Sequence, residues 1–180
     1  MSAAHPDHAE GWEWVRIQRD PCPQCGHHPA GLPPGALGAG AVTSASAWRG
    51  YLQAAADADL RTCPAPSVWS PLQYGAHVRD MLAVFGNRIL VAVTEDDPIV
   101  PSFDPGPAGW SAYNLLDAGE LADELEAEAA RFQSIVAGVD ASAWSRTARR
   151  DGVDRFTVAG LACFGVHEAH HHLLDAERRW

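Results

Sequence analysis

The chain has 180 residues, of which 47% are hydrophobic, and its 13 basic and 23 acidic side chains give a formal net charge of -10. This length and apolar content suit one domain with a buried core, with or without a short appendage. The negative charge repels phosphate backbones and anionic membrane surfaces, so neither nucleic acid nor membranes are expected partners. The apolar runs are too short to cross a bilayer, and the first residues lack the basic and apolar regions of a signal peptide. We therefore expect a cytoplasmic protein.

Residues 1–36 contain six prolines and several glycines, a density that prevents a long helix. This segment is predicted to be an irregular N-terminal arm, followed by one helical domain over residues 37–180. The first helix of that domain is expected in the alanine-rich stretch 37–60, before Pro64 and Pro66.

Three further helices are predicted from their start signals. Ser70-Pro71 with Gln73 forms the pattern of a capping box and starts a helix that runs to about residue 93. Asp117 is placed to cap a third helix, whose apolar positions recur every three or four residues up to Val136. Thr157 is placed to cap a fourth helix over 158–177.

The segment 98–113 contains four prolines and two glycines and is predicted to be a long loop beside a functional site. No strand pattern competes with the helical periodicity elsewhere. The predicted fold class is therefore all-α, a four-helix bundle with an irregular arm.

The nine histidines are the most informative residues. His167 and His171 are four residues apart, so they lie on one helix face and can bind one ion together. His77 lies on the apolar side of the second helix and is the expected third ligand. A lone buried histidine usually bonds to a carbonyl, and a histidine-rich helix end is often solvated; these are the alternatives. His170 and His172 point to other sides of the helix and are expected at the surface or in supporting positions.

Residues 68–77 and 166–171 resemble the two signature regions of the DinB-like superfamily, which includes mycothiol-dependent maleylpyruvate isomerases. The resemblance covers about residues 37–177. It implies a four-helix bundle in which His77, His167 and His171 bind one metal, zinc or else nickel, with open positions. It further implies a metal-dependent S-transferase that joins a low-molecular-weight thiol, such as mycothiol, to an electrophilic small molecule. A homodimer is also consistent with the resemblance.

An ion with an open coordination position lowers the pKa of a water or a thiol bound to it, so a metal-dependent hydrolase is the nearest alternative. A stress-related binding module, or a dimer with a structural metal, is the alternative that involves no reaction. No separate general base is evident in the sequence, so the catalytic residues stay unassigned. The substrate pocket is expected to include Tyr74, Phe103, Trp110 and Cys163.

Cys22 and Cys25 in the arm form half of a zinc knuckle. A closed structural site needs four ligands, and the nearest further donors in the sequence are His27 and His28. A second, structural zinc ion is therefore one hypothesis for the arm. A redox-reactive dithiol and an inert pair of loop cysteines are the others.

Overall fold

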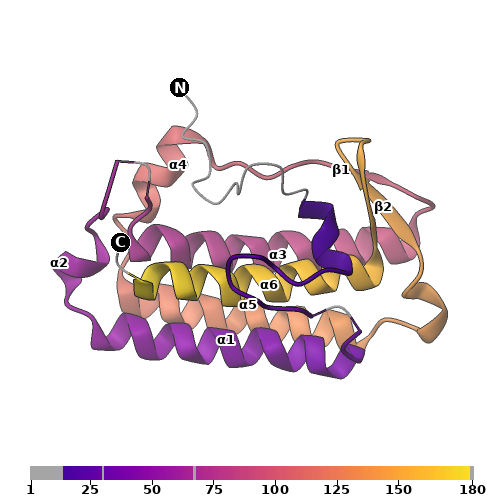
Figure 1. Cartoon of the computed structure of the whole chain (residues 1–180), viewed down its shortest axis with the longest axis horizontal. Helices are drawn as coiled ribbons and strands as arrows, with labels where there is room; N and C mark the ends of the chain where they lie inside the picture. The colour runs from indigo at the N-terminus through magenta and orange to yellow at the C-terminus, as the bar shows by residue number, and fades with distance from the viewer. Residues whose placement is uncertain (1–13, 30, 67, 179–180) are drawn as a thin grey trace.

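Four long helices form a bundle in the computed structural model, which describes residues 14–29, 31–66 and 68–178 (Figure 1). Helices α1 and α3 each pack against both α5 and α6, so α1 lies diagonally opposite α3. This arrangement confirms the predicted all-α bundle. In the described part of the chain, no helix has an apolar stretch long enough to span a membrane. The four helices are α1 (Pro34–Ala54), α3 (Pro71–Thr94), α5 (Ala118–Ala137) and α6 (Val158–Arg178).

The predicted start signals of three helices are confirmed by their hydrogen bonds. Ser70 and Gln73 make both bonds of the capping box at the start of α3. The Asp117 carboxylate accepts from two backbone N–H groups in the first turn of α5. The Thr157 hydroxyl accepts from the N–H of Gly160 at 2.9 Å at the start of α6. These side chains satisfy backbone donors that a helix end leaves without intrahelical partners.

The first helix differs from its predicted bounds. It begins earlier, because Pro34 fits the first helical position, where a backbone N–H is not needed. It ends at Ala54, and a separate short helix, α2 (Asp57–Leu60), follows after a break in extended conformation. The break turns the Leu60 side chain into the core, where it is 1% exposed.

A small sheet that the sequence did not predict lies at one end of the bundle (Figure 1). Its strands are β1 (Ile99–Val100), β2 (Thr147–Arg150) and β3 (Asp154–Thr157), in that spatial order. Strand β1 pairs in parallel with β2, and β2 pairs antiparallel with β3 through a turn in which Asp151 and Gly152 have positive φ. The strands escaped prediction because they are only two to four residues long, and β2 and β3 carry arginines instead of an apolar alternation.

The segment 98–113, predicted to be a long loop, also contains regular structure. It contains β1 and a short helix, α4 (Gly106–Tyr113), which packs against α3. Gln73 on α3 donates to the carbonyl of Trp110 at 3.0 Å and fixes this contact. Through this contact α4 lies beside the N-terminal part of α3, and the segment is ordered rather than a long loop.

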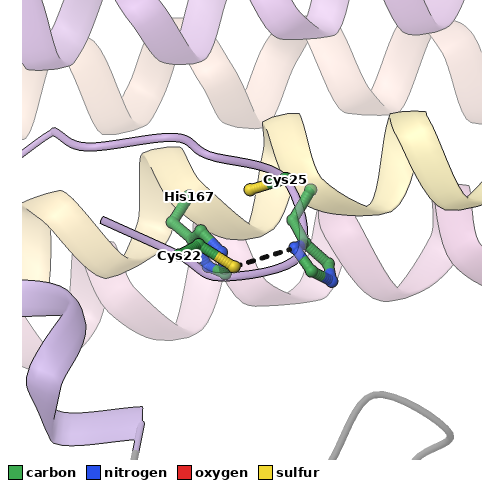
Figure 2. A group of neighbouring side chains, drawn as sticks. Cys22, Cys25 and His167 are labelled. Carbon is green, nitrogen blue, oxygen red and sulfur yellow. Dashed lines mark hydrogen bonds between the residues drawn. The ribbon is translucent and has the colours of Figure 1, made fainter. Parts of the chain in front are cut away.

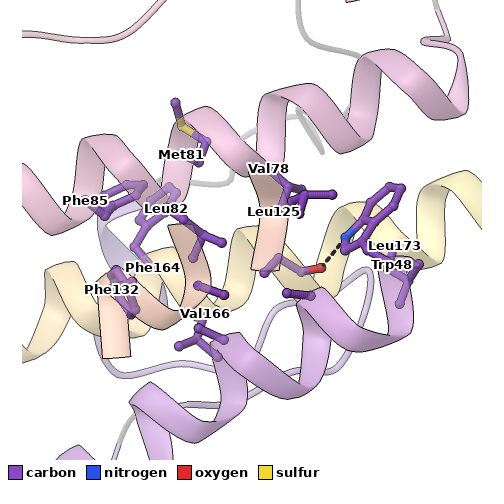
Figure 3. Close-up of a cluster of buried hydrophobic side chains, with 14 of the residues drawn as sticks. Trp48, Val78, Met81, Leu82, Phe85, Leu125, Phe132, Phe164, Val166 and Leu173 are labelled. Carbon is purple, nitrogen blue, oxygen red and sulfur yellow. Dashed lines mark hydrogen bonds between the residues drawn. The ribbon is translucent and has the colours of Figure 1, made fainter. Parts of the chain in front are cut away.

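The core is built from the inward faces of all four long helices (Figure 3). The Trp48 indole reaches from α1 to α6, where its Nε1 donates to the carbonyl of Ala169 at 3.0 Å. This bond satisfies the one polar atom of a side chain that is otherwise buried among apolar groups. Core side chains shown in Figure 3 include Trp48, Val78, Met81, Leu82, Phe85, Leu125, Phe132, Phe164, Val166 and Leu173.

The described part of the N-terminal arm is docked along α6 rather than free of the bundle (Figure 1). It begins with a 3-10 helix, η1 (Trp14–Gln18), from which the Ile17 side chain enters the core. The Gln18 side chain bridges to the start of α6: its Nε2 donates to the Arg155 carbonyl at 3.1 Å and its Oε1 accepts from the Thr157 N–H at 2.9 Å.

The close approach of α6 to α3 and α5 requires Gly165. A Cβ atom at this position would lie 2.9 Å from the Phe132 ring and 3.3 Å from the Phe85 Cβ. We predict that Gly165→Ala lowers the free energy of unfolding by about 1–3 kcal/mol, as overpacked cores do. Urea denaturation monitored by circular dichroism measures it.

Gly50 provides the matched control for this substitution. It is exposed on α1, and an added Cβ would meet nothing within 4 Å. Gly50→Ala is expected to stabilise the protein by about 0.4–1 kcal/mol, because alanine restricts the unfolded chain and favours a helix. Equal effects of the two substitutions would contradict the close packing described at Gly165.

Candidate metal centre

Three buried side chains from α3 and α6 converge on one point between these helices. His77 Nε2 lies 3.2 Å from Glu168 Oε2, and His172 Nε2 lies 3.4 Å from the same oxygen. All three residues are more than nine-tenths buried. One nitrogen from each ring and one carboxylate oxygen thus lie within 4.8 Å of one another, close enough to share an ion.

Asp175 fixes the orientation of the His172 ring. Its Oδ2 lies 3.0 Å from His172 Nδ1, and a carboxylate only accepts, so Nδ1 is the donor. This contact leaves Nε2 directed toward Glu168. Burial by itself would lower the pKa of His172, but the hydrogen bonds to Asp175 and Glu168 outweigh it and raise the pKa to about 9.

Glu168 is the negative centre of this cluster. Burial would raise the pKa of its carboxyl, but hydrogen bonds with His167, His172 and His77 hold it well below the ordinary value. The carboxylate is therefore ionised in the interior, with imidazoles around it. Such an arrangement is the one in which a buried charge is tolerated.

Aromatic side chains enclose the cluster. The Tyr74 ring stacks on His172 with centroids 5.3 Å apart, and the Trp69 ring lies 5.2 Å from that of His77. Trp110 of α4 lies 4.0 Å from Trp69 and 5.7 Å from His77. These rings restrict the access of water to the three donors.

An open cleft begins beside this aromatic wall. Trp69 and Asp175 line it together with Asp59, Thr62 and Ala176, so the cleft lies beside the residue that holds His172. Among its described lining residues there are two acidic side chains and none that is basic. The cleft therefore favours neutral or cationic molecules over anions.

A second cluster lies on the other side of α6, where the arm crosses it (Figure 2). It consists of Cys22, Cys25, His167 and His171, whose donor atoms also lie within 4.8 Å of one another. Cys22 Sγ lies 3.6 Å from His171 Nδ1. The hydrogen bond with Cys25 holds the pKa of Cys22 below its ordinary value, with further contributions from His167 and His171, while the pKa of Cys25 is raised by Cys22 and by burial.

Two carboxylates connect the clusters. Glu168 of the first cluster approaches His167 of the second, with Oε1 lying 3.5 Å from Nδ1. Asp175, which bonds to His172, also lies 3.3 Å from His171 Nε2 through the same oxygen. The two groups share no residue, but a third set of donors joins them: atoms of His171, His172 and Asp175 also lie within 4.8 Å of one another.

The geometry favours other donor groups than the predicted three-histidine site, which stays a prediction. His77 does not share a donor cluster with His167 and His171, although all three are buried. The reason is the helical repeat of about 100° per residue: positions 167 and 171 face the arm, whereas positions 168 and 172 face α3. His77 on α3 therefore meets Glu168 and His172.

For the arm cysteines, too, the geometry favours other donors than the predicted ones. Neither His27 nor His28 is among the donors that converge with Cys22 and Cys25. His28 is exposed, and its Nε2 bonds to the Arg19 carbonyl at 2.8 Å. The His27 ring packs on His170 with centroids 4.6 Å apart, and burial lowers its pKa to about 4. Short ligand spacing suggested these two histidines, but their rings contact the Arg19 carbonyl and His170.

The four predicted pocket residues are placed differently from one another. Tyr74 and Trp110 lie against the first cluster. Phe103 lies at the surface, where 37% of it is exposed. Cys163 is buried in the core, and burial raises the pKa of its thiol to about 11. Cys163 is therefore placed as a small apolar residue.

Glu168, His172 and Asp175 were not predicted as site residues. A usable signal was present, because Glu168 and His172 have the same four-residue spacing as His167 and His171. A search limited to histidine pairs overlooks it, although a carboxylate ligates divalent metals equally well. The Asp175 contact could not be predicted without knowing which face of α6 is directed toward α3.

Comparison with known proteins now places the chain in a family. A sequence profile of the DinB superfamily matches residues 42–176. The chain belongs to the DinB superfamily. No curated protein sequence matches it significantly. Among solved structures, it is similar to YfiT from Bacillus subtilis, described as a probable metal-dependent hydrolase with an unusual four-helix bundle topology. The TM-score is 0.74 at 16% identity, over 83% of this chain and 87% of YfiT, so the likeness shows the fold.

The placement of Cys163 in this DinB-superfamily fold predicts its reactivity. In the folded protein at neutral pH, iodoacetamide should alkylate buried Cys163 at least about 100-fold more slowly than exposed Cys63, because the thiolate is the reacting species. Peptide mass spectrometry over a time course measures both rates. Alkylation in guanidinium chloride is the control, in which the rates should converge. Similar rates in the folded protein would contradict the buried placement of Cys163.

Proposed function

We propose that this chain is a metal-dependent hydrolase whose divalent ion is held by His77, Glu168 and His172. The observation that supports this proposal most strongly is the convergence of the three buried donors beside an open cleft. The description of YfiT as a probable metal-dependent hydrolase agrees with it. The proposal replaces the ligand set expected from the sequence by one in which Glu168 and His172 take the places of the other two histidines.

The residues present fit a catalytic ion better than a structural one. Two imidazoles and one carboxylate are the protein ligands of many catalytic zinc sites, which keep a position open. The same set also holds non-haem iron, and its nitrogen donors suit nickel. We propose zinc first. An ion bound there supplies Lewis acidity and lowers the pKa of a molecule at its open position.

The protein's own residues prepare this site in a specific way. Asp175 accepts a hydrogen bond from Nδ1 of His172, so Nε2 is the nitrogen that would hold an ion. Glu168 supplies the negative charge that offsets the ion. Trp69 and Trp110 exclude bulk water from one side, and Asp175, which holds His172, is also one of the residues that line the cleft.

The cleft limits the class of substrate. Its described lining is apolar and acidic, with Asp59 and Asp175 as its charged groups. A small neutral or cationic ester or amide fits this surface, and an anionic substrate is repelled. Transfer of a thiol such as mycothiol onto an electrophile, the reaction expected from the resemblance, requires the same ion with a different nucleophile. The two reactions are distinguished by the nucleophile that they consume, which is water in hydrolysis and a thiol in S-transfer.

We predict that His77→Ala and Glu168→Gln each lower kcat/KM by at least about 100-fold, because each removes one of three donors. The assay is a panel of neutral and cationic ester and amide substrates with zinc-loaded, nickel-loaded and iron-loaded protein. His28→Ala is the control, since it removes an exposed histidine outside both clusters and should retain the activity. Each substrate is assayed with and without mycothiol and glutathione.

Asp175→Asn tests the positioning role of the carboxylate. It should weaken zinc binding at the first cluster by about 10–100-fold while circular dichroism stays unchanged.

The assays with and without thiols distinguish the two reactions. Turnover without any thiol supports hydrolysis, whereas turnover only with a thiol overturns it in favour of S-transfer. Absence of turnover with every metal and thiol, together with intact metal binding, would support a binding role and contradict both reactions.

A further inference from the structure

We propose that Cys22, Cys25, His167 and His171 bind one structural zinc ion, which fastens the N-terminal arm to α6. The site is distinct from the proposed catalytic cluster, and its existence does not depend on the proposed function. Two donors come from a short turn in the arm and two from successive turns of one helix (Figure 2).

The arm has the backbone of a zinc knuckle between Cys22 and His27. The Cys22 carbonyl accepts from the Gly26 N–H at 2.8 Å, and the Cys22 N–H donates to the His27 carbonyl at 3.0 Å. Gly26 has a φ of 71°, which a residue with a side chain rarely adopts. The His27 N–H then points to Cys25 Sγ at 3.4 Å, so a backbone donor supports one sulfur. The turn directs both thiols toward α6.

The spacing of the donors agrees with tetrahedral zinc. With Zn–S bonds of about 2.3 Å and Zn–N bonds of about 2.0–2.1 Å, sulfur and nitrogen ligands should lie about 3.6 Å apart. Cys22 Sγ and His171 Nδ1 are 3.6 Å apart. The four donors all lie within 4.8 Å of one another before any adjustment to an ion.

His171 is oriented as a zinc ligand by its second nitrogen. Its Nδ1 faces Cys22, while Nε2 lies 3.3 Å from the Asp175 carboxylate. A carboxylate beside the far nitrogen favours one orientation of the ring and makes it a better ligand. The histidine therefore has the same kind of support that His172 has in the other cluster.

The composition of the set indicates a closed, structural site. Two thiolates and two imidazoles complete four-coordinate zinc and leave no position for a substrate. Cys22, His167 and His171 are almost fully buried, and Cys25 is half-buried. Zinc here neutralises the two thiolates and thereby makes their burial favourable.

The proposed ion would join segments that are about 140 residues apart in sequence. Apart from it, the described contacts that attach the arm to α6 include Ile17 in the core, the Gln18 bonds at the start of the helix and a 3.2 Å bond from Arg178 to the Gln24 carbonyl. A metal bond at the middle of α6 fixes the turn between these points. Metal binding of this kind contributes directly to folding stability.

Cobalt substitution of the full-length protein tests the proposal, because Co²⁺ bound by thiolates shows a sulfur-to-metal charge-transfer band in the near ultraviolet. We expect this band in the wild type and in His77→Ala, and its loss in Cys22→Ser and in His167→Ala. The controls are Cys63→Ser, which removes an exposed thiol, and His170→Ala, which removes the neighbouring histidine of α6; both should retain the band. Loss of the band in His77→Ala, which leaves all four proposed ligands in place, would contradict separate sites.

Zinc protection of the native thiols gives a second test that needs no substitution. In the zinc-loaded protein, iodoacetamide should modify Cys22 and Cys25 at least about tenfold more slowly than after chelation. X-ray absorption at the zinc edge should show two sulfur ligands in the first shell. Zinc without sulfur ligands, alkylation rates that chelation does not change, or a Cys22–Cys25 disulfide formed in the presence of zinc would each overturn the proposal. Failure of hydrolysis would leave these readouts unchanged.

Discussion

The periodicity of α6 is the constraint on which both clusters depend. Successive side chains of a helix are turned by about 100°, so two pairs with four-residue spacing, offset by one residue, face different neighbours. His167 and His171 meet the arm, while Glu168 and His172 meet α3. One helical stretch of six residues thus supplies donors to two separate groups. The close approach of α6 to α3, permitted by Gly165, brings His77 into reach of the second pair.

Asp175 links the arm to the proposed catalytic cluster. Its Oδ2 lies near His171 Nε2 and near His172 Nδ1. In each ring, the other nitrogen faces the remaining donors of that histidine's cluster. A shift of the arm that moves His171 therefore changes the environment of His172 through a single residue. Glu168 provides a second link through His167. In our proposal the two sites share these carboxylates, so we expect an ion at one site to change the affinity of the other.

The sequence predicted the framework because its signals are local. Capping by Ser70, Asp117 and Thr157 and the apolar periodicity of the long helices depend on residues within a few positions of one another. These signals fixed three helix starts and the all-α class. The family resemblance is confirmed over residues 42–176. The short strands failed to appear because their pairing is set by contacts across the chain, such as that of Ile99 with Arg149.

The site was predicted only in part, for a physical reason. Spacing shows which residues of α6 share a face, but not which neighbour that face meets. The sequence therefore identified His77 and the His167–His171 pair as buried groups and assigned them to one ion, although the rotation of α6 divides them. The histidines that lie beside Cys22 and Cys25 could not be predicted from local spacing either, because His167 and His171 follow the cysteines by more than 140 residues. Glu168 and His172 could have been predicted from their four-residue spacing if carboxylates had been counted as ligands.

The central claim is that one helix serves two separate metal sites. Anomalous diffraction from crystals of the full-length, zinc-loaded protein tests it most directly, because it locates each ion independently of any assay. The account predicts two peaks, one among His77, Glu168 and His172 and one among Cys22, Cys25, His167 and His171. A single peak bound jointly by His77, His167 and His171 would contradict it.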